Sequence, residues 1–170
     1  PVNWAGLLTR RYMEQYGVTE EDVGHHAIAQ REHASRNDDA FFQDPLTMDE
    51  YLASRYVSKP VRLLDCDYPC DSGSAVIFTT EERARDLAKP PVIVESASLM
   101  ATRDLNFEIL SDMVETSPAA CAKAIWERAD FGPNELSMAQ LYDGFSIIPF
   151  QWLEALGICG EGEAAAFIRD

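Results

Sequence analysis

The stretch Tyr142-Asp143-Gly144-Phe145 holds the residues of this sequence whose types and order suggest chemistry most clearly. The phenol of Tyr142 can donate or accept a proton, and the carboxylate of Asp143 can accept one. Both are therefore candidate catalytic residues, and we expect Gly144 and Phe145 to bind the substrate. A structural role stays open for three of them: Tyr142 as a half-buried aromatic, Asp143 as a helix cap, and Gly144 as the site of an unusual backbone angle.

The sequence around this motif predicts a strand before it and a helix after it. Apolar residues predict a strand over 138–142 and a helix over 146–156 that ends at Gly157. A polar turn between a strand and a helix is where α/β folds present reactive side chains. Further apolar runs predict buried strands over 73–79 and 92–94. Alternation of strands with helices favours a layered α/β fold.

The remaining helices are predicted from apolar periodicity and from capping residues. A threonine followed three residues later by an acidic residue is a helix-start signature, and it occurs at Thr19 and Thr47. Thr80 is a simpler cap ahead of a short charged helix. The predicted helices cover residues 4–16, 19–35, 47–53, 80–87 and 118–129. We divide the chain into a helical and loop region, 1–72, and a second half, 73–170.

Composition limits the kinds of molecule that this chain can bind. The chain has 170 residues, of which 46% are hydrophobic, so it can bury one substantial core. Its formal net charge of −15 opposes binding to nucleic acid. No apolar run approaches the roughly 20 residues that a membrane span needs, and we expect a cytoplasmic protein with no membrane partner. The chain starts at Pro1 and ends after a glycine-rich turn, so we expect a fragment of a longer protein.

The potential metal-binding residues suggest no metal site, and nothing in the sequence calls for a cofactor. The four cysteines match neither a zinc nor a redox spacing. The three histidines fall on one predicted helix but lack the i, i+4 pair and acid of a zinc site. These residues are Cys66, Cys70, Cys121 and Cys159, with His25, His26 and His33.

Three stretches together resemble the thiolase superfamily, specifically its sterol-carrier-protein, lipid-transfer-type branch. They are Glu32 to Asn37, Tyr51 to Ala75, and Tyr142 to Glu163, and they follow the order of the family. The resemblance implies a thiolase-like, layered αβαβα fold in a homodimer. It also implies that this chain covers the end of the loop region and most of the second half.

The motif itself departs from the thiolase pattern. Thiolases carry Asn-Glu-Ala-Phe at this junction and the sterol-carrier branch carries His-Asp-Cys-Phe, whereas this chain has Tyr142-Asp143-Gly144-Phe145. The tyrosine form resembles aldolases that cleave steroid side chains. The resemblance implies a carbon–carbon lyase of lipid metabolism that cuts a bulky, steroid-derived β-hydroxyacyl-CoA into a ketone and propionyl-CoA. It further implies a small zinc-ribbon and OB-fold partner protein that binds acyl-CoA.

Two other functions stay open at this point. A degradative thiolase or acyltransferase would use a nucleophilic cysteine from outside this chain, since none of the four cysteines matches a catalytic position. A scaffold subunit would carry out no chemistry. For the lyase, the role of Tyr142 as base, acid or enolate donor is also open, and Asp143 competes for the role of base.

Overall fold

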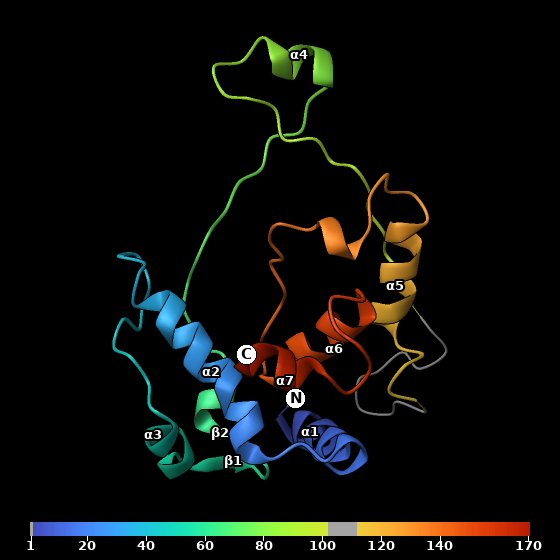
Figure 1. The fold of residues 1–170 in the computed structure, drawn as a ribbon. Helices are drawn as coiled ribbons and strands as arrows, with labels where there is room; N and C mark the ends of the chain where they lie inside the picture. The colour runs from blue at the N-terminus through green and yellow to red at the C-terminus, as the bar shows by residue number, and fades with distance from the viewer. Residues whose placement is uncertain (1, 102–111) are drawn as a thin grey trace.

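Helices dominate the part of the chain that the structure describes, residues 2–101 and 112–170 of a computed structural model (Figure 1). None of the helices in these residues is long and apolar enough to cross a membrane. The α-helices are α1 Val2–Tyr16, α2 Glu20–Ala34, α3 Met48–Ala53, α4 Glu81–Arg85, α5 Ser117–Trp126, α6 Ile147–Ala155 and α7 Ala164–Arg169. Short 3₁₀ turns cover Leu63–Asp65 (η1) and Pro133–Glu135 (η2).

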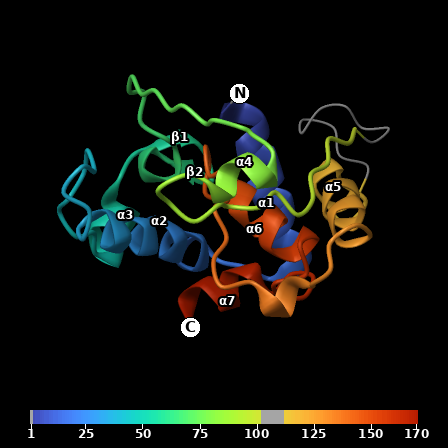
Figure 2. The ribbon, with the colours of Figure 1, turned by 90° about the horizontal axis from the view of Figure 1, so that it is seen from above.

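The core lies where α6 meets α1, α5 and α7, and α2 packs against α7 beside it (Figures 1 and 2). Helix α6 is buried on most sides because its sequence is almost wholly apolar. Tyr12 of α1 and Phe150 of α6 are fully buried and pack edge to face at 5.6 Å. The hydroxyl of Tyr12 donates to the Glu154 carboxylate, so its polar end is satisfied inside the core.

Local capping chemistry fixes the helix starts, as the sequence predicts. Thr19 and Thr47 are extended residues whose hydroxyls accept hydrogen bonds from the backbone N–H groups of Asp22 and Glu50. The two acids reach back to the threonine backbone, which completes both capping boxes. Thr80 caps α4 in the simpler way. These predictions are confirmed.

A two-stranded hairpin lies within the 1–72 region, where the sequence predicts helices and loops but no strand. Strand β1, Tyr56–Ser58, pairs antiparallel with β2, Val61–Arg62. The buried Arg62 fastens the hairpin to α2, because its guanidinium donates to the Glu20 carboxylate at 2.6 and 3.1 Å. The sequence pattern predicts neither this hairpin nor α7.

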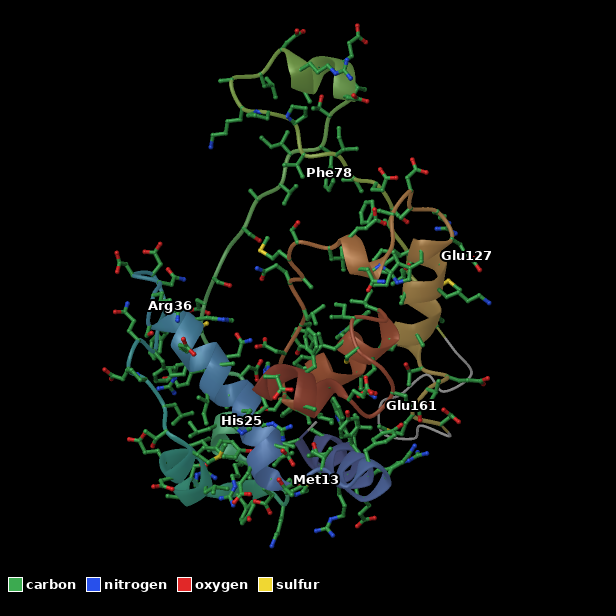
Figure 3. The ribbon with its side chains drawn as sticks, in the orientation of Figure 1. Met13, His25, Arg36, Phe78, Glu127 and Glu161 are labelled. Atoms are coloured by element: carbon green, nitrogen blue, oxygen red, sulfur yellow. The ribbon has the colours of Figure 1, made fainter. Side chains whose placement is uncertain are left out.

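The three predicted strands are wrong as secondary structure. Residues 73–79, 92–94 and 138–142 all have irregular backbone. The first two form arms that carry α4 away from the core, and Phe78 lies on one of them (Figure 3). Ile77 is 90% exposed and Val92 is 94% exposed. A strand requires a hydrogen-bonded neighbour, and none of the described residues pairs with these segments.

Candidate functional site

The motif loop leads directly into α6 and is held by the segment that follows η1. Two backbone hydrogen bonds join the two segments, which are far apart in sequence. Asp67 N–H donates to Gly144 C=O at 3.2 Å and Ser146 N–H donates to Asp65 C=O at 3.0 Å, and together these bonds form the antiparallel bridge between Cys66 and Phe145. The chain on either side of Gly144 is therefore fixed in position.

The buried carboxylate of Asp65 reinforces this attachment. Asp65 is 4% exposed, and its Oδ1 accepts hydrogen bonds from Tyr51 Oη at 2.9 Å and Ser146 Oγ at 2.8 Å. Its Oδ2 accepts the backbone N–H of Arg62 at 2.7 Å. Burial raises the pKa of the Asp65 carboxyl, and these three donors oppose the increase. Asp65 thus ties α3, the hairpin and the start of α6 together.

Asp143 points toward α2, where its carboxylate meets a buried histidine. Its Oδ2 lies 3.7 Å from Nε2 of His26, a separation at which the contact is electrostatic rather than a normal hydrogen bond. The neighbouring His26 lowers the pKa of the half-buried Asp143 carboxyl, while burial acts in the opposite direction. Asp143 does not cap α6: Ser146 occupies the N-cap position, and no side chain caps the helix. The expected capping role is therefore wrong.

Tyr142 is 67% exposed, so it is not the half-buried aromatic that the sequence suggested as an alternative. Within residues 2–101 and 112–170, no group is hydrogen-bonded to its hydroxyl. Its ring lies over Gly144, where an added Cβ would sit 2.6 Å from the ring carbon Cζ. Gly144 does not have a positive φ angle, so the expected unusual backbone angle is wrong. The glycine instead makes room for the tyrosine.

Phe145 turns inward, toward the edge of the core. Its ring packs edge to face on Trp4 of α1, with 5.5 Å between the ring centroids. The side chain is partly buried against the core cluster. Phe145 therefore anchors the motif to α1, and its predicted contact with substrate stays a prediction, as does that of Gly144.

We expect Gly144→Ala to displace the Tyr142 ring, because the new methyl group would overlap it. The loop backbone allows alanine, so folding should be nearly unchanged. The expected result in the full-length protein is a lower kcat with little change in melting temperature. Gly73→Ala is the matched control, since a Cβ there meets nothing within 4 Å. Equal turnover in the two variants would contradict this account.

A cavity of about 320 Å³ lies on the Asp143 side of the motif. Asp143, His26 and Asp65 line its polar part, and Tyr142 does not line it. The other part is lined by an aromatic cluster in which Phe41 and Tyr68 stack at 4.7 Å and Phe42 packs edge to face on both. Of the two predicted catalytic residues, only Asp143 therefore lines this cavity. His26, which the sequence analysis treated only as one of three histidines, belongs to the site.

The helical spacing of His26 is a sequence signal for its burial. His26 lies three residues after Val23, so the two residues share a face of α2, and in the structure both side chains are buried. A histidine at such a position requires a polar partner. The identity of that partner was not visible, because Asp143 comes from a distant part of the chain.

The described residues contain no cluster of three metal-ligand side chains. All four cysteines are free thiols. Cys66 lies next to the motif, and burial raises the pKa of its thiol, which disfavours the reactive thiolate. Among the described residues, the site therefore offers the proton-transfer and hydrogen-bonding groups of Tyr142, Asp143 and His26 rather than a thiolate nucleophile.

The lowered pKa of Asp143 predicts a pH-dependent contribution to stability. The pKa of the Asp143 carboxyl is lower in the folded state than in the unfolded state, where it is near 3.9. The ionised carboxyl therefore stabilises the fold at pH values above 3.9, and this contribution is lost as the pH falls through the lowered pKa. We therefore expect the difference in urea midpoint between wild type and Asp143→Asn to be full at pH 7 and to shrink below about pH 4. A difference that stays constant down to pH 3 would contradict the His26 contact.

Comparisons with known proteins show which family and which proteins this chain resembles. Residues 100–170 match the family described as thiolase C-terminal domain-like. The whole chain is 34% identical to a steroid side-chain-cleaving aldolase of Thermomonospora curvata, of which it covers 45%. It is also 34% identical to the 17-hydroxy-3-oxo-4-pregnene-20-carboxyl-CoA lyase of Mycobacterium tuberculosis, again with 100% of this chain and 45% of the relative covered.

A solved structure gives the same result in three dimensions. The Ltp2-ChsH2(DUF35) aldolase superposes with a TM-score of 0.90 and 34% sequence identity. The match covers 97% of this chain and 44% of that chain. This chain therefore spans a little under half the length of the proteins it matches.

Proposed function

Because this chain belongs to the thiolase superfamily and resembles its steroid side-chain-cleaving aldolases, we propose that the full-length protein is a carbon–carbon lyase. Its substrate is a bulky, steroid-derived β-hydroxyacyl-CoA, and its products are a ketone and propionyl-CoA. The relatives named as aldolase and lyase support the reaction class.

The observation that carries this proposal is the presentation of Tyr142. The residue is 67% exposed, its ring lies over Gly144, and its hydroxyl has no hydrogen-bond partner in the part of the chain that the structure describes. A phenol placed in this way can take part in a proton transfer or donate a hydrogen bond to a bound substrate. A tyrosine that served only packing would be buried, with its hydroxyl satisfied.

The reaction needs few groups. A base removes the proton of the β-hydroxyl, and the bond between Cα and Cβ breaks as the β-carbon becomes the carbonyl carbon of the ketone. The electron pair of the broken bond forms the thioester enolate, which a proton at Cα converts to propionyl-CoA. Tyr142 can serve as the base, as the acid that protonates Cα, or as a hydrogen-bond donor to the enolate oxygen.

Asp143 is the weaker candidate for the base. Its carboxylate faces His26, and the contact lowers its pKa. A general base works best when its pKa is near the operating pH, and a carboxylate with a lowered pKa is far from that condition. We therefore assign Asp143 to holding the loop and Tyr142 to the substrate.

We further propose that the active protein is an assembly. The exposed apolar residues of the two arms, among them Val76, Ile77 and Val92, are costly to leave in water and would be covered in such an assembly. The family resemblance favours a homodimer, and the matched aldolase structure is named with a ChsH2(DUF35) component. A small acyl-CoA-binding protein of the zinc-ribbon and OB-fold type is the partner we propose.

The test is a product assay with the full-length protein, alone and with its DUF35-type partner. A β-hydroxyacyl-CoA with a steroid-derived acyl group should yield the ketone and propionyl-CoA in equal amounts, without free CoA. Cleavage that consumes CoA and leaves a trappable acyl-enzyme would instead identify a thiolase. No turnover of any acyl-CoA by the complete assembly would favour a scaffold subunit.

A further inference from the structure

His26 is a buried polar side chain that contacts the motif and that the proposed reaction does not use. It is 6% exposed, and its ring lies edge to face on Phe150 of α6, with 6.5 Å between the centroids. Its Nε2 is directed at Asp143, 3.7 Å from Oδ2. A buried imidazole is costly without a polar partner, so its pairing with a motif residue constrains both side chains.

A second carboxylate, which is buried, lines the same cavity from another element. Asp65 of η1 borders this cavity together with His26 and Asp143, and burial raises the pKa of the Asp65 carboxyl. Asp67 and Arg31 line this cavity as well. The cavity that His26 lines is therefore bordered by one carboxylate from before the motif in sequence and by one from within it.

Asp65 and His26 hold opposite ends of the motif loop. Asp65 binds Ser146 through its side chain and its backbone carbonyl, at 2.8 and 3.0 Å, which fixes the end that enters α6. His26 holds Asp143 on the cavity side, which fixes the other end. Asp143 lines the cavity, whereas the neighbouring Tyr142 does not line it and lies over Gly144 instead. Because the two residues are adjacent in the chain, the contact that holds Asp143 also restrains the backbone that carries Tyr142.

We infer that His26 is a positioning residue for Tyr142: by holding the Asp143 carboxylate on the cavity side of the loop, it fixes the direction in which Tyr142 presents its hydroxyl. This inference rests on the proposed function only in that Tyr142 acts on the substrate. A histidine that served the core alone would affect stability and leave the direction of Tyr142 unchanged.

The first test compares His26→Phe and His26→Gln in the full-length protein with its partner. Phenylalanine keeps the ring and removes the interaction with Asp143, whereas the glutamine amide can still donate toward the carboxylate. We expect His26→Phe to lower kcat by about 10- to 100-fold with KM changed less than about twofold, because a small misplacement of a reacting group is costly. His26→Gln should recover most of that loss. His33→Gln, on an exposed part of the same helix, should match wild type.

The second test does not depend on activity. In a crystal structure of full-length His26→Phe, the Asp143 carboxylate should turn away from α2 and the Tyr142 ring should leave Gly144. If His26→Phe does not fold, the structure of His26→Gln should still show Asp143 facing α2 and Tyr142 over Gly144. A His26→Phe structure with both side chains unmoved would overturn the inference, and so would equal loss of kcat in the Phe and Gln variants. Failure of wild type to cleave the substrate would overturn the proposed function and leave the structural test decisive.

Discussion

Replacing Tyr142 by phenylalanine in the full-length protein is expected to lower kcat by about 10²- to 10⁴-fold, the usual cost of losing a proton-transfer group or an enolate donor. The change removes one hydroxyl, which no group in the described residues binds, from an exposed residue, and it leaves the ring over Gly144. Folding and substrate affinity should therefore stay near wild type. Steady-state kinetics measure the effect, and circular dichroism checks the fold.

Two further variants make this result interpretable. Tyr68→Phe removes a hydroxyl from another exposed tyrosine, in the aromatic cluster, and should leave kcat nearly unchanged. Asp143→Asn should cost less than Tyr142→Phe, because the carboxylate holds the loop rather than reacting with substrate. Near-total loss in Asp143→Asn alone, with an active Tyr142→Phe, would move the base to Asp143.

The second large effect concerns stability. Asp65→Leu is expected to lower the free energy of unfolding by about 3–5 kcal/mol, because it leaves buried donors without an acceptor. These donors are the Tyr51 and Ser146 hydroxyls and the backbone N–H of Arg62. The loss should appear in urea unfolding of the full-length protein.

Two substitutions bracket the expected loss. Asp65→Asn keeps one acceptor oxygen and should be less damaging than Asp65→Leu. Asp67→Asn changes an exposed acid two residues away and should stay within about 0.5 kcal/mol of wild type. A mild effect of Asp65→Leu, comparable to that of Asp67→Asn, would mean that Asp65 does not hold the motif loop.

The parts of the fold that the sequence predicted correctly depend on neighbours in the chain. Capping by Thr19 and Thr47 requires residues three positions away, and both capping boxes are present. Gly157 ends α6 with a φ of +71°, as a C-terminal glycine should. The thiolase-like fold class was also predictable, through motifs spread along the chain, and the structural match confirms it.

The failures involve contacts between distant segments. The apolar run 73–79 has the composition of a buried strand, yet a strand also needs a partner, and composition does not say whether this chain supplies one. The hairpin at 56–62 was missed because much of its attachment comes from Glu20, on another element. The division of the chain at residue 72 stays a prediction.

The motif shows the same limit at the level of single side chains. Its residue types were evident, but the direction of each was not. The structural role left open for Asp143 was to cap the helix that follows it, and the structure pairs it with His26 instead. Gly144 was expected to relieve a backbone angle, and it instead makes room for Tyr142. These roles depend on what packs around the loop.

Cleavage of the steroid-derived β-hydroxyacyl-CoA in D₂O, followed by mass spectrometry of both products, tests the central claim most directly. Retro-aldol cleavage predicts propionyl-CoA with one deuterium at Cα, since the enolate takes its proton from exchangeable groups. The ketone should retain the oxygen of the β-hydroxyl, and no free CoA should be consumed. A steroid acyl-CoA product formed with consumption of CoA would contradict the account.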